Sequence, residues 1–268
     1  MNILITGVHG FVGSNLVKAL VPEHTIFGLD IVAPKKEGVK KTFFWEDLPS
    51  TNLGQTQLLD FPKIDAIIHL AGKAHDTRNK STADVYFRVN TGLTQRIFDW
   101  FLTSKSAKKF IFFSTVKSAA DRVEGEFLTE ECVPTPVGPY GESKIKAEDY
   151  IIGHFAPEAL KRPYHNFDDS DSLVKGKNVY IIRPCMIHGP GNKGNLNLLY
   201  GVVSKGIPWP LGAFENRRSF TSIGNLCVVI DGFLTKNVPS GIYHMGDDEA
   251  LSTNELIQVI CEALGKKA

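Results

Sequence analysis

The sequence predicts an α/β fold, in which a doubly wound parallel sheet spans residues 1–183 and a smaller, interleaved C-terminal lobe spans residues 184–268. Short apolar runs alternate with segments of helical periodicity up to Pro184, a rhythm typical of right-handed β–α–β crossovers. The apolar runs contain few polar residues, as strands buried on both faces of a sheet do. Beyond Pro184, Gly and Pro become frequent and the rhythm is lost, which predicts a loop-rich lobe.

The elements follow from local patterns. Apolar runs such as AII and IFF predict strands over residues 2–6, 25–30, 65–70, 109–114 and 178–183. Apolar residues at helical spacing predict helices that end near residue 20 and that cover residues 84–103 and 142–154. The polar segment 156–177 is expected to be an exposed loop. In the smaller lobe we expect a helix at 196–205, a strand at 241–245 and a helix at 253–264.

Composition excludes several classes of function. The 268 residues carry a formal net charge of +1, so no global field attracts nucleic acid. Four cysteines lie far apart without a CxxC or Cys/His cluster, which predicts neither a disulfide framework nor a metal site. No apolar run reaches the roughly 18 residues that a membrane span needs, and the N-terminus lacks a cationic leader. We therefore expect a cytoplasmic globular protein without membrane or nucleic-acid partners.

The segment Thr6 to Gly13, TGVHGFVG, follows a predicted strand and opens a predicted helix. Its glycines permit a tight turn and let main-chain N–H groups at a helix N-terminus approach a diphosphate. Asp30 ends the next strand, where a carboxylate accepts hydrogen bonds from both adenosine ribose hydroxyls and repels a 2′-phosphate. The combination favours an NAD site over a purely structural turn. Nearby Lys35 and Lys36 count against this preference over NADP.

The second chemical motif is Tyr140-Gly-Glu-Ser-Lys144. On a helix, residues four apart share a face, so the lysine ammonium can stabilise a tyrosine phenolate. The pKa of tyrosine is normally about 10, and one unit corresponds to about 1.4 kcal/mol, so a base active near neutrality needs roughly 4 kcal/mol of stabilisation. Ser114 and Thr115 end a preceding strand, where hydroxyls reach the ligand crevice of a parallel sheet. Alone, the Tyr/Lys pair also fits a solvated helix face.

Together these motifs resemble the extended short-chain dehydrogenases/reductases, in particular their NAD-dependent epimerase/dehydratase branch, which acts on nucleotide sugars. The resemblance covers nearly the whole chain and follows the order of the motifs Thr6–Gly13, His69-Leu-Ala-Gly72, Val89-Asn90, Ser114-Thr115, Tyr140/Lys144 and Arg183-Pro184. It implies a Rossmann-type domain with bound NAD, a small C-terminal substrate-binding lobe and a homodimer formed through the helices near 84–103 and 142–154.

The resemblance also implies roles for individual residues. Tyr140 would be the catalytic base, Lys144 would lower its pKa, and Thr115, supported by Ser114, would bind the reacting hydroxyl. The remaining cofactor-binding residues would be Gly7, His9, Gly10, Phe11, Val12, Gly13, Asp30, Asp47, Leu48, Leu70, Ala71, Gly72, Lys73, Asn90, Pro184, Cys185 and Ile187. The substrate would contact His75, Thr115, Asn197, Leu198 and Arg218, the arginine binding the diphosphate through its planar fork.

Departures from the family pattern narrow the activity. The family's dehydratases resemble one another in having Asp-Glu directly after the catalytic threonine. Here Val116-Lys117 follows Thr115, so the acid/base pair for the elimination of water is missing. The leading hypothesis is therefore a nucleotide-sugar 4-epimerase, acting on a UDP-hexose or UDP-N-acetylhexosamine of surface-polysaccharide synthesis. Two alternatives stay open: a 4-ketoreductase of a nucleotide deoxysugar, which would use the same residues, and a non-catalytic dinucleotide sensor. The intact Thr115, Tyr140 and Lys144 count against the sensor.

Overall fold

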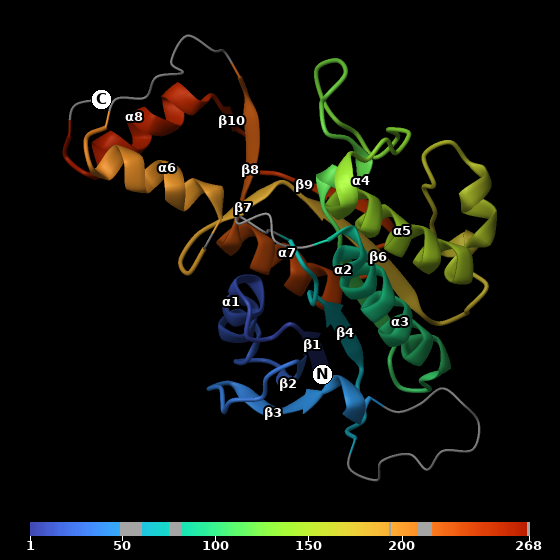
Figure 1. Cartoon of the computed structure of the whole chain (residues 1–268). Coiled ribbons are helices and arrows are strands. Elements are labelled where there is room, and N and C mark those ends of the chain that lie inside the picture. The colour runs from blue at the N-terminus through green and yellow to red at the C-terminus, as the bar shows by residue number, and fades with distance from the viewer. Residues whose placement is uncertain (49–60, 75–81, 193, 208–215, 267–268) are drawn as a thin grey trace. The chain divides into compact units, whose positions relative to one another are not determined.

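A computed structural model describes residues 1–48, 61–74, 82–192, 194–207 and 216–266 (Figure 1). The chain divides into two compact units. The first contains Met1–Pro184 and Cys227–His244, and the second contains Cys185–Leu226 and Met245–Ala268.

The first unit is built on a sheet with the strand order β3-β2-β1-β4-β5-β6-β9. The strands are β1 (Asn2–Thr6), β2 (Thr25–Asp30), β3 (Val39–Phe44), β4 (Ala66–His69), β5 (Lys109–Phe113), β6 (Asn178–Pro184) and β9 (Gly241–Met245). The pairs β2–β3, β1–β2, β1–β4, β4–β5 and β5–β6 are all parallel. The chain leaves β1 in one direction towards β2 and later continues in the other from β4, which places the topological switch point between β1 and β4.

Helices cover both faces of this sheet, as in a doubly wound Rossmann-type fold. They are α1 (Phe11–Leu20), α2 (Ala83–Tyr86), a π-helical segment (Phe87–Gly92), α3 (Leu93–Thr103), α4 (Val116–Ala119), α5 (Gly138–Phe155) and α7 (Ile223–Thr235). Phe110 and Val179 pack with apolar residues of α3 and α5 in one buried cluster. Tyr180, the next residue along β6, has its ring 4.6 Å from that of Phe233 on α7. Alternate residues of β6 therefore face opposite helical layers.

The five strands expected in the first domain are confirmed to within a residue or two, but two further strands belong to the sheet. β3 is an edge strand that we did not predict. The strand expected at 241–245 is present as β9, but it belongs to the seven-stranded sheet, so its assignment to the smaller lobe was wrong. The helix expected at 84–103 is interrupted by the π-helical turn, and α7 was not predicted.

The polar segment 156–177 is more ordered than an exposed loop. It contains two 3₁₀ turns, Pro157–Lys161 and Asp169–Asp171, and it buries Phe167 against the core beneath. Arg162 forms an ion pair of 2.5 Å with Asp171 across it. The expectation of an exposed loop was therefore wrong for the part of the segment that packs on the domain.

The second unit contains a three-stranded sheet and two helices. In the order β10-β8-β7, β10 (Ala250–Leu251) is antiparallel to β8 (Arg218–Ser222), and β8 is parallel to β7 (Met186–His188). The helices α6 (Asn195–Ser204) and α8 (Thr253–Ala263) match the expected helices at 196–205 and 253–264. Within the described residues, none of the helices is both long and apolar enough to span a bilayer.

Candidate active site

The glycine-rich turn leaves β1 and starts α1 as the sequence predicts. Gly7 adopts a positive φ of 67°, which favours glycine. A Cβ on Gly13 would lie 2.6 Å from the carbonyl oxygen of Gly7, so no side chain fits where the helix meets the turn. Asp30, at the end of β2, accepts hydrogen bonds from the N–H groups of His9 (3.2 Å) and Ile31 (2.8 Å). The carboxylate is thereby fixed beside the turn.

A chain of buried hydrogen bonds fixes the end of β4 next to that turn. The hydroxyl of Thr6 lies 2.7 Å from Nδ1 of His69 and accepts from the N–H groups of Leu70 (3.1 Å) and Ala71 (2.9 Å). Nε2 of the same imidazole lies 2.9 Å from the hydroxyl of Thr94. Burial, together with the nearby ammonium of Lys144, lowers the pKa of His69 well below its ordinary value. His69 is therefore a neutral structural residue and not a base.

Asn90 holds the next loop in place from the π-helical turn. Its Oδ1 accepts from the N–H of Lys73 (2.6 Å), and its Nδ2 donates to the carbonyl of Lys73 (3.1 Å) and to the hydroxyl of Ser143 on α5 (2.9 Å). A Cβ on Gly72 would lie 3.0 Å from Asn90 Oδ1 and 3.2 Å from Lys144 Nζ. Glycine at this position therefore lets the main chain lie directly against the predicted catalytic lysine.

Tyr140 and Thr115 meet as the sequence motif predicts. Tyr140 lies in the first turn of α5, and a side-chain hydrogen bond joins it to Thr115, which caps the N-terminus of α4 after β5. Burial raises the pKa of Tyr140, Tyr86 raises it further, and the bond with Thr115 lowers it. The two tyrosine rings are in an edge-on arrangement, with centroids 6.4 Å apart. Tyr86, which lies in the helix predicted at 84–103, is thus a neighbour of the site that the sequence motifs did not indicate.

Lys144 lies one turn further along α5 and is only 5% exposed. Its Nζ donates to the carbonyl of Phe113 (2.7 Å) and lies 4.9 Å from the centre of the Phe112 ring. Burial lowers the pKa of Lys144 to about 8, although the carboxylate of Glu148 acts in the opposite direction. The structure thus joins Tyr140 to Thr115 and places the buried Lys144 one turn further along the same helix.

The remaining predicted residues of the first unit have mixed surroundings. The hydroxyl of Ser114 donates to buried Glu148 and lies 3.2 Å from that of Ser118. The carboxylate of Asp47 accepts from the N–H of Phe44 (2.8 Å), and Leu48 belongs to the buried core. Phe11 and Val12 begin α1, and Pro184 ends β6. His75 lies outside the described residues.

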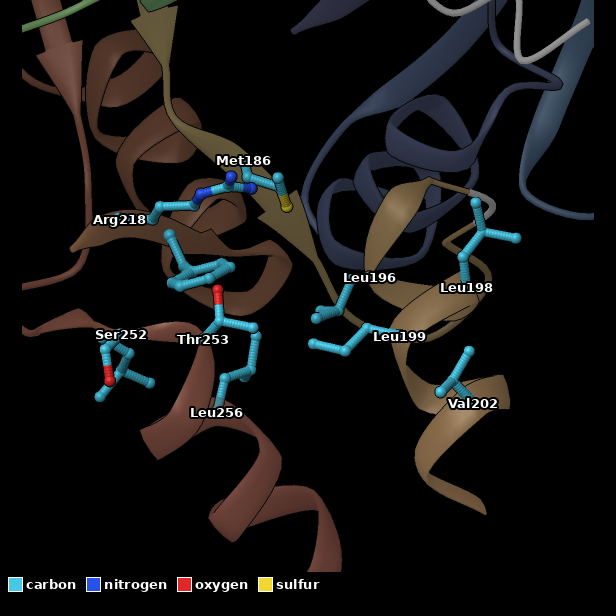
Figure 2. Close-up of a pocket in the computed structure, with 11 residues that line it drawn as sticks. Met186, Leu196, Leu198, Leu199, Val202, Arg218, Ser252, Thr253 and Leu256 are labelled. Carbon is cyan, nitrogen blue, oxygen red and sulfur yellow. The ribbon is translucent and has the colours of Figure 1, made fainter. Parts of the chain in front are cut away.

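In the second unit, two of the predicted substrate residues, Leu198 and Arg218, line an apolar pocket with a volume of about 290 Å³ (Figure 2). Leu199 points from α6 towards Leu256 on α8, and Arg218 lies above them on β8 (Figure 2). Leu198, also in the lining, is 64% exposed. Asn197, one residue earlier, donates from its amide to the carbonyl of Asn192. The pocket lining therefore combines the exposed side chain of Arg218 with several aliphatic side chains.

Two further residues predicted to bind the cofactor, Cys185 and Ile187, lie next to and within β7. Cys185 precedes β7, and its N–H donates to the carbonyl of Met245 (2.8 Å). Burial raises the pKa of the Cys185 thiol, which argues against a reactive thiolate. Ile187 lies within β7, opposite Thr221 of β8.

Comparison with known proteins agrees with this fold and shows the family of the chain. A family model described as "NAD dependent epimerase/dehydratase family" matches residues 3–246. The chain belongs to this family. Its members are NAD-dependent enzymes, and the α/β fold with a Rossmann-type sheet is the one that such a member should have.

Three relatives of this epimerase/dehydratase illustrate the similarity. The UDP-glucose 4-epimerase of Vibrio cholerae is 30% identical over 276 residues, which cover 99% of this chain and 76% of the relative. The N-acetyl-alpha-D-glucosaminyl-diphospho-ditrans,octacis-undecaprenol 4-epimerase of Escherichia coli O157:H7 is 28% identical, with 99% and 73% covered. The structure of Thermotoga maritima UDP-glucose 4-epimerase with UDP-glucose superposes with a TM-score of 0.75 at 20% identity, covering 100% of this chain and 84% of that one.

The residues present fit the NAD that the family uses. The turn of Gly7 and Gly13 leaves no room for side chains and presents the N-terminus of α1, which suits a diphosphate. Nε2 of His9, within the same turn, is buried without a hydrogen-bond partner among the described residues. The carboxylate of Asp30 lies at the strand end that typically binds the adenosine ribose.

Proposed function

We propose that this epimerase/dehydratase family member is a nucleotide-sugar 4-epimerase, with a UDP-hexose or UDP-N-acetylhexosamine as substrate. The observation that carries the proposal is the hydrogen bond between Tyr140 and buried Thr115, with the buried ammonium of Lys144 one helical turn away on α5. Reversible oxidation at a single carbinol needs only these groups together with NAD.

In this proposal Tyr140 takes the proton of the C4 hydroxyl and later returns it to the same oxygen. Burial alone raises the pKa of Tyr140, so its phenolate requires compensation. The hydrogen bond with Thr115 provides part of it, and in this proposal the ammonium of Lys144, one turn further along α5, provides another part. When bound, NAD would supply the remaining positive charge and the reversible hydride acceptor for C4. Gly7, Gly13 and Asp30 would hold this cofactor.

The residues after Thr115 support an epimerase over a dehydratase. Elimination of water from the sugar needs an additional acid and base next to the reacting carbons. Here Val116 and Lys117 occupy the first turn of α4, and the side chain of Lys117 is exposed and paired with Asp121 at 3.1 Å. Val116 and Lys117 therefore do not form a buried acid/base pair beside Thr115.

The pocket of the second unit supports a substrate with a diphosphate and an apolar-faced group. The guanidinium of Arg218 can bind phosphate oxygens in a bidentate manner, and Leu196, Leu199 and Leu256 offer apolar contact to a base or sugar face. Two of the relatives named above are 4-epimerases of a UDP-sugar and of a lipid-linked diphosphosugar, respectively. Both have a sugar joined to a diphosphate in their names.

The proposal includes a homodimer formed through α3 and α5, which a hydrogen bond from Tyr150 to Asp99 (2.6 Å) already joins within one chain. Sedimentation of the purified protein tests it.

We also propose a role in surface-polysaccharide synthesis in the cytoplasm, where nucleotide sugars are available.

The test combines cofactor release and a substrate panel. The purified protein is denatured and the released nucleotide is identified, and native protein is incubated with UDP-glucose, UDP-galactose and their N-acetylated counterparts. Retained NAD with interconversion of C4 isomers supports the epimerase. Consumption of added NADH or NADPH by a 4-keto sugar, without isomer interconversion, would instead support the ketoreductase.

A further inference from the structure

Glu148 is a buried carboxylate to which the mechanism above assigns no role. It follows Tyr140 and Lys144 on α5 at the same four-residue spacing, so the three side chains share one helix face. Its side chain has no solvent exposure. A carboxylate buried in this way is costly unless it is paired and fully hydrogen-bonded.

Arg183, near the end of β6, neutralises this charge and is itself completely buried. Nη2 of the guanidinium lies 2.5 Å from Oε2 of Glu148, and Nε lies 3.2 Å from Oε1 and 3.1 Å from Oε2. The ion pair therefore joins the central sheet to the helix that carries Tyr140 and Lys144.

Glu148 also holds both sides of the turn that contains Thr115. Its Oε1 accepts hydrogen bonds from the hydroxyls of Ser114 and Ser118, the latter at 2.5 Å. The N–H of Ser118 in turn donates to the carbonyl of Thr115 at 3.0 Å. A single carboxylate oxygen thus fixes the residues immediately before and shortly after Thr115.

The opposite side of the guanidinium is also occupied. Nη1 of Arg183 lies 3.4 Å from Nε2 of His244 on β9, whose Nδ1 lies 3.1 Å from the carbonyl of Leu128. The main-chain N–H of His244 donates to Glu130 at 2.7 Å. Burial lowers the pKa of His244, which fits a neutral ring that accepts from Arg183. Among the described residues, the titratable groups around the pair include Lys144 and Asp149 on the helix of Glu148, and His244 and Glu130 beyond Arg183.

We propose that Glu148 and Arg183 are positioning residues, which set Thr115 at hydrogen-bonding distance from Tyr140 by holding Ser114 and Ser118. This inference rests on the proposed function, in which Thr115 and Tyr140 act on the same hydroxyl. Neither residue of the pair touches the reacting atoms, so the effect on the reaction passes through the turn at Thr115.

Stability and positioning can be separated because a buried ion pair contributes little net stability relative to a neutral replacement of similar shape. The paired variant Glu148→Gln with Arg183→Met leaves no buried charge unpaired. We expect it to fold and to retain NAD. We expect kcat to fall about 10- to 100-fold with KM changed less than about threefold, as for a small misplacement of a catalytic group. A folded, NAD-loaded variant with kcat within about twofold of the parent would overturn the proposal.

Ser118→Ala is a milder variant that changes no charge and keeps the proposal testable if the paired variant does not fold. It is combined with Thr115→Ala in a double-mutant cycle. If Ser118 acts through Thr115, its replacement lowers kcat in the parent but not in the Thr115→Ala background. Equal losses in the two backgrounds would show an independent structural effect and overturn the proposal.

A control variant is available at the other end of β5. Lys109 Nζ donates to the carbonyls of Phe233 (2.7 Å) and Leu234 (2.8 Å), away from Thr115. Lys109→Met should lower Tm without changing kcat. If it lowers kcat as much as Ser118→Ala does, loss of stability alone explains the effect on activity, and the proposal fails.

A titration without substrate separates failure of this inference from failure of the proposed function. The tyrosinate absorbance of Tyr140 is measured in NAD-loaded protein as the difference from a Tyr140→Phe background. Ser118→Ala should raise the pKa of Tyr140, because it weakens the hold on Thr115, whose hydrogen bond lowers that pKa. An unchanged pKa would overturn the positioning role, whereas a parent that epimerises no panel sugar would overturn only the proposed activity.

Discussion

Lys144 donates a hydrogen bond from Nζ to the main-chain carbonyl of Phe113 at 2.7 Å, and Phe113 is the last residue of β5, two positions before Thr115. Helix α5 and the strand that precedes Thr115 are thus joined through the lysine itself. Lys144 has a structural contact as well as a charge to provide, so its replacement should affect both the geometry and the electrostatics of the site.

Replacement of Tyr140 tests the assignment of the base. Tyr140→Phe removes the ionisable group and should lower kcat by about 10²- to 10⁴-fold, the usual contribution of a general acid/base. NAD content after purification should stay close to that of the parent. Tyr150→Phe is the matched control on the same helix, since the hydroxyl of Tyr150 donates to Asp99. Burial and the neighbouring Asp99 raise the pKa of Tyr150 to about 12. Turnover by Tyr140→Phe at the parent rate would remove Tyr140 from the mechanism.

The buried ammonium of Lys144 predicts a pH dependence of stability. Its pKa is lowered from 10.5 in the unfolded chain to about 8 in the folded protein, so the unfolded state binds more protons between these values. The free energy of unfolding should therefore rise with pH in this window, by about 3 kcal/mol for this group alone. Urea titrations of the apoprotein measure it.

Lys144→Met should lose this rise, while Lys117→Met, which replaces an exposed cation on α4, should retain it. A Lys144→Met variant whose stability depends on pH across the window as the parent's does would contradict the lowered pKa.

Asp30 is predicted to select NAD over NADP. Asp30→Ala should weaken NAD binding about 10- to 100-fold, because hydrogen bonds to a charged group contribute about 1.5–3 kcal/mol. It should also reduce the discrimination against NADP. Asp30→Asn is the control, because it can still accept the N–H of Ile31 while lacking the negative charge that repels a 2′-phosphate. Equilibrium binding of both cofactors measures the ratio, and an unchanged ratio in both variants would mean that Asp30 does not read the ribose.

The close approach at Gly13 predicts a strong effect of a single methyl group. In Gly13→Ala the new Cβ would lie 2.6 Å from the carbonyl oxygen of Gly7 and 2.9 Å from Cα of Val8, both main-chain atoms that cannot move independently. We expect loss of bound NAD and destabilisation by about 1–3 kcal/mol, as in overpacked sites. Gly232→Ala on α7 meets nothing within 4 Å and should stabilise the protein by up to about 1 kcal/mol. Thermal unfolding of both variants checks the difference; equal Tm values would contradict the steric argument.

The sequence predicted the interior of the main sheet better than its edges. The strands β2, β1, β4, β5 and β6 each lie between two other strands of the sheet. They are nearly continuous apolar runs, as expected for strands that are buried on both faces of a sheet. β3 was missed because it is an edge strand in which Lys40 and Lys41 are exposed, so it lacks that signal. The π-helical turn was not predicted either. Asn90 within it contacts Lys73 and Ser143, which lie far from it along the chain, so local sequence patterns do not show these contacts.

The motif residues of the candidate site could be named from spacing, but their supporting partners could not. Tyr140 and Lys144 are separated by one helical turn, which sequence displays directly. Glu148 reads from sequence as an ordinary polar residue, and its partner Arg183 lies 35 positions away on a strand. Only the packing of α5 against β6 shows that both are buried and that they enclose the turn at Thr115.

The most direct test of the central claim follows a hydrogen atom. NAD-loaded protein is incubated with a UDP-hexose that carries deuterium at C4, and both C4 isomers are analysed by mass spectrometry and NMR. The account predicts that the C4 epimer accumulates with deuterium still at C4 and that none enters the solvent or free cofactor. Epimer that has lost the label, or label transferred to cofactor in solution, would contradict reversible oxidation at C4 within one closed site.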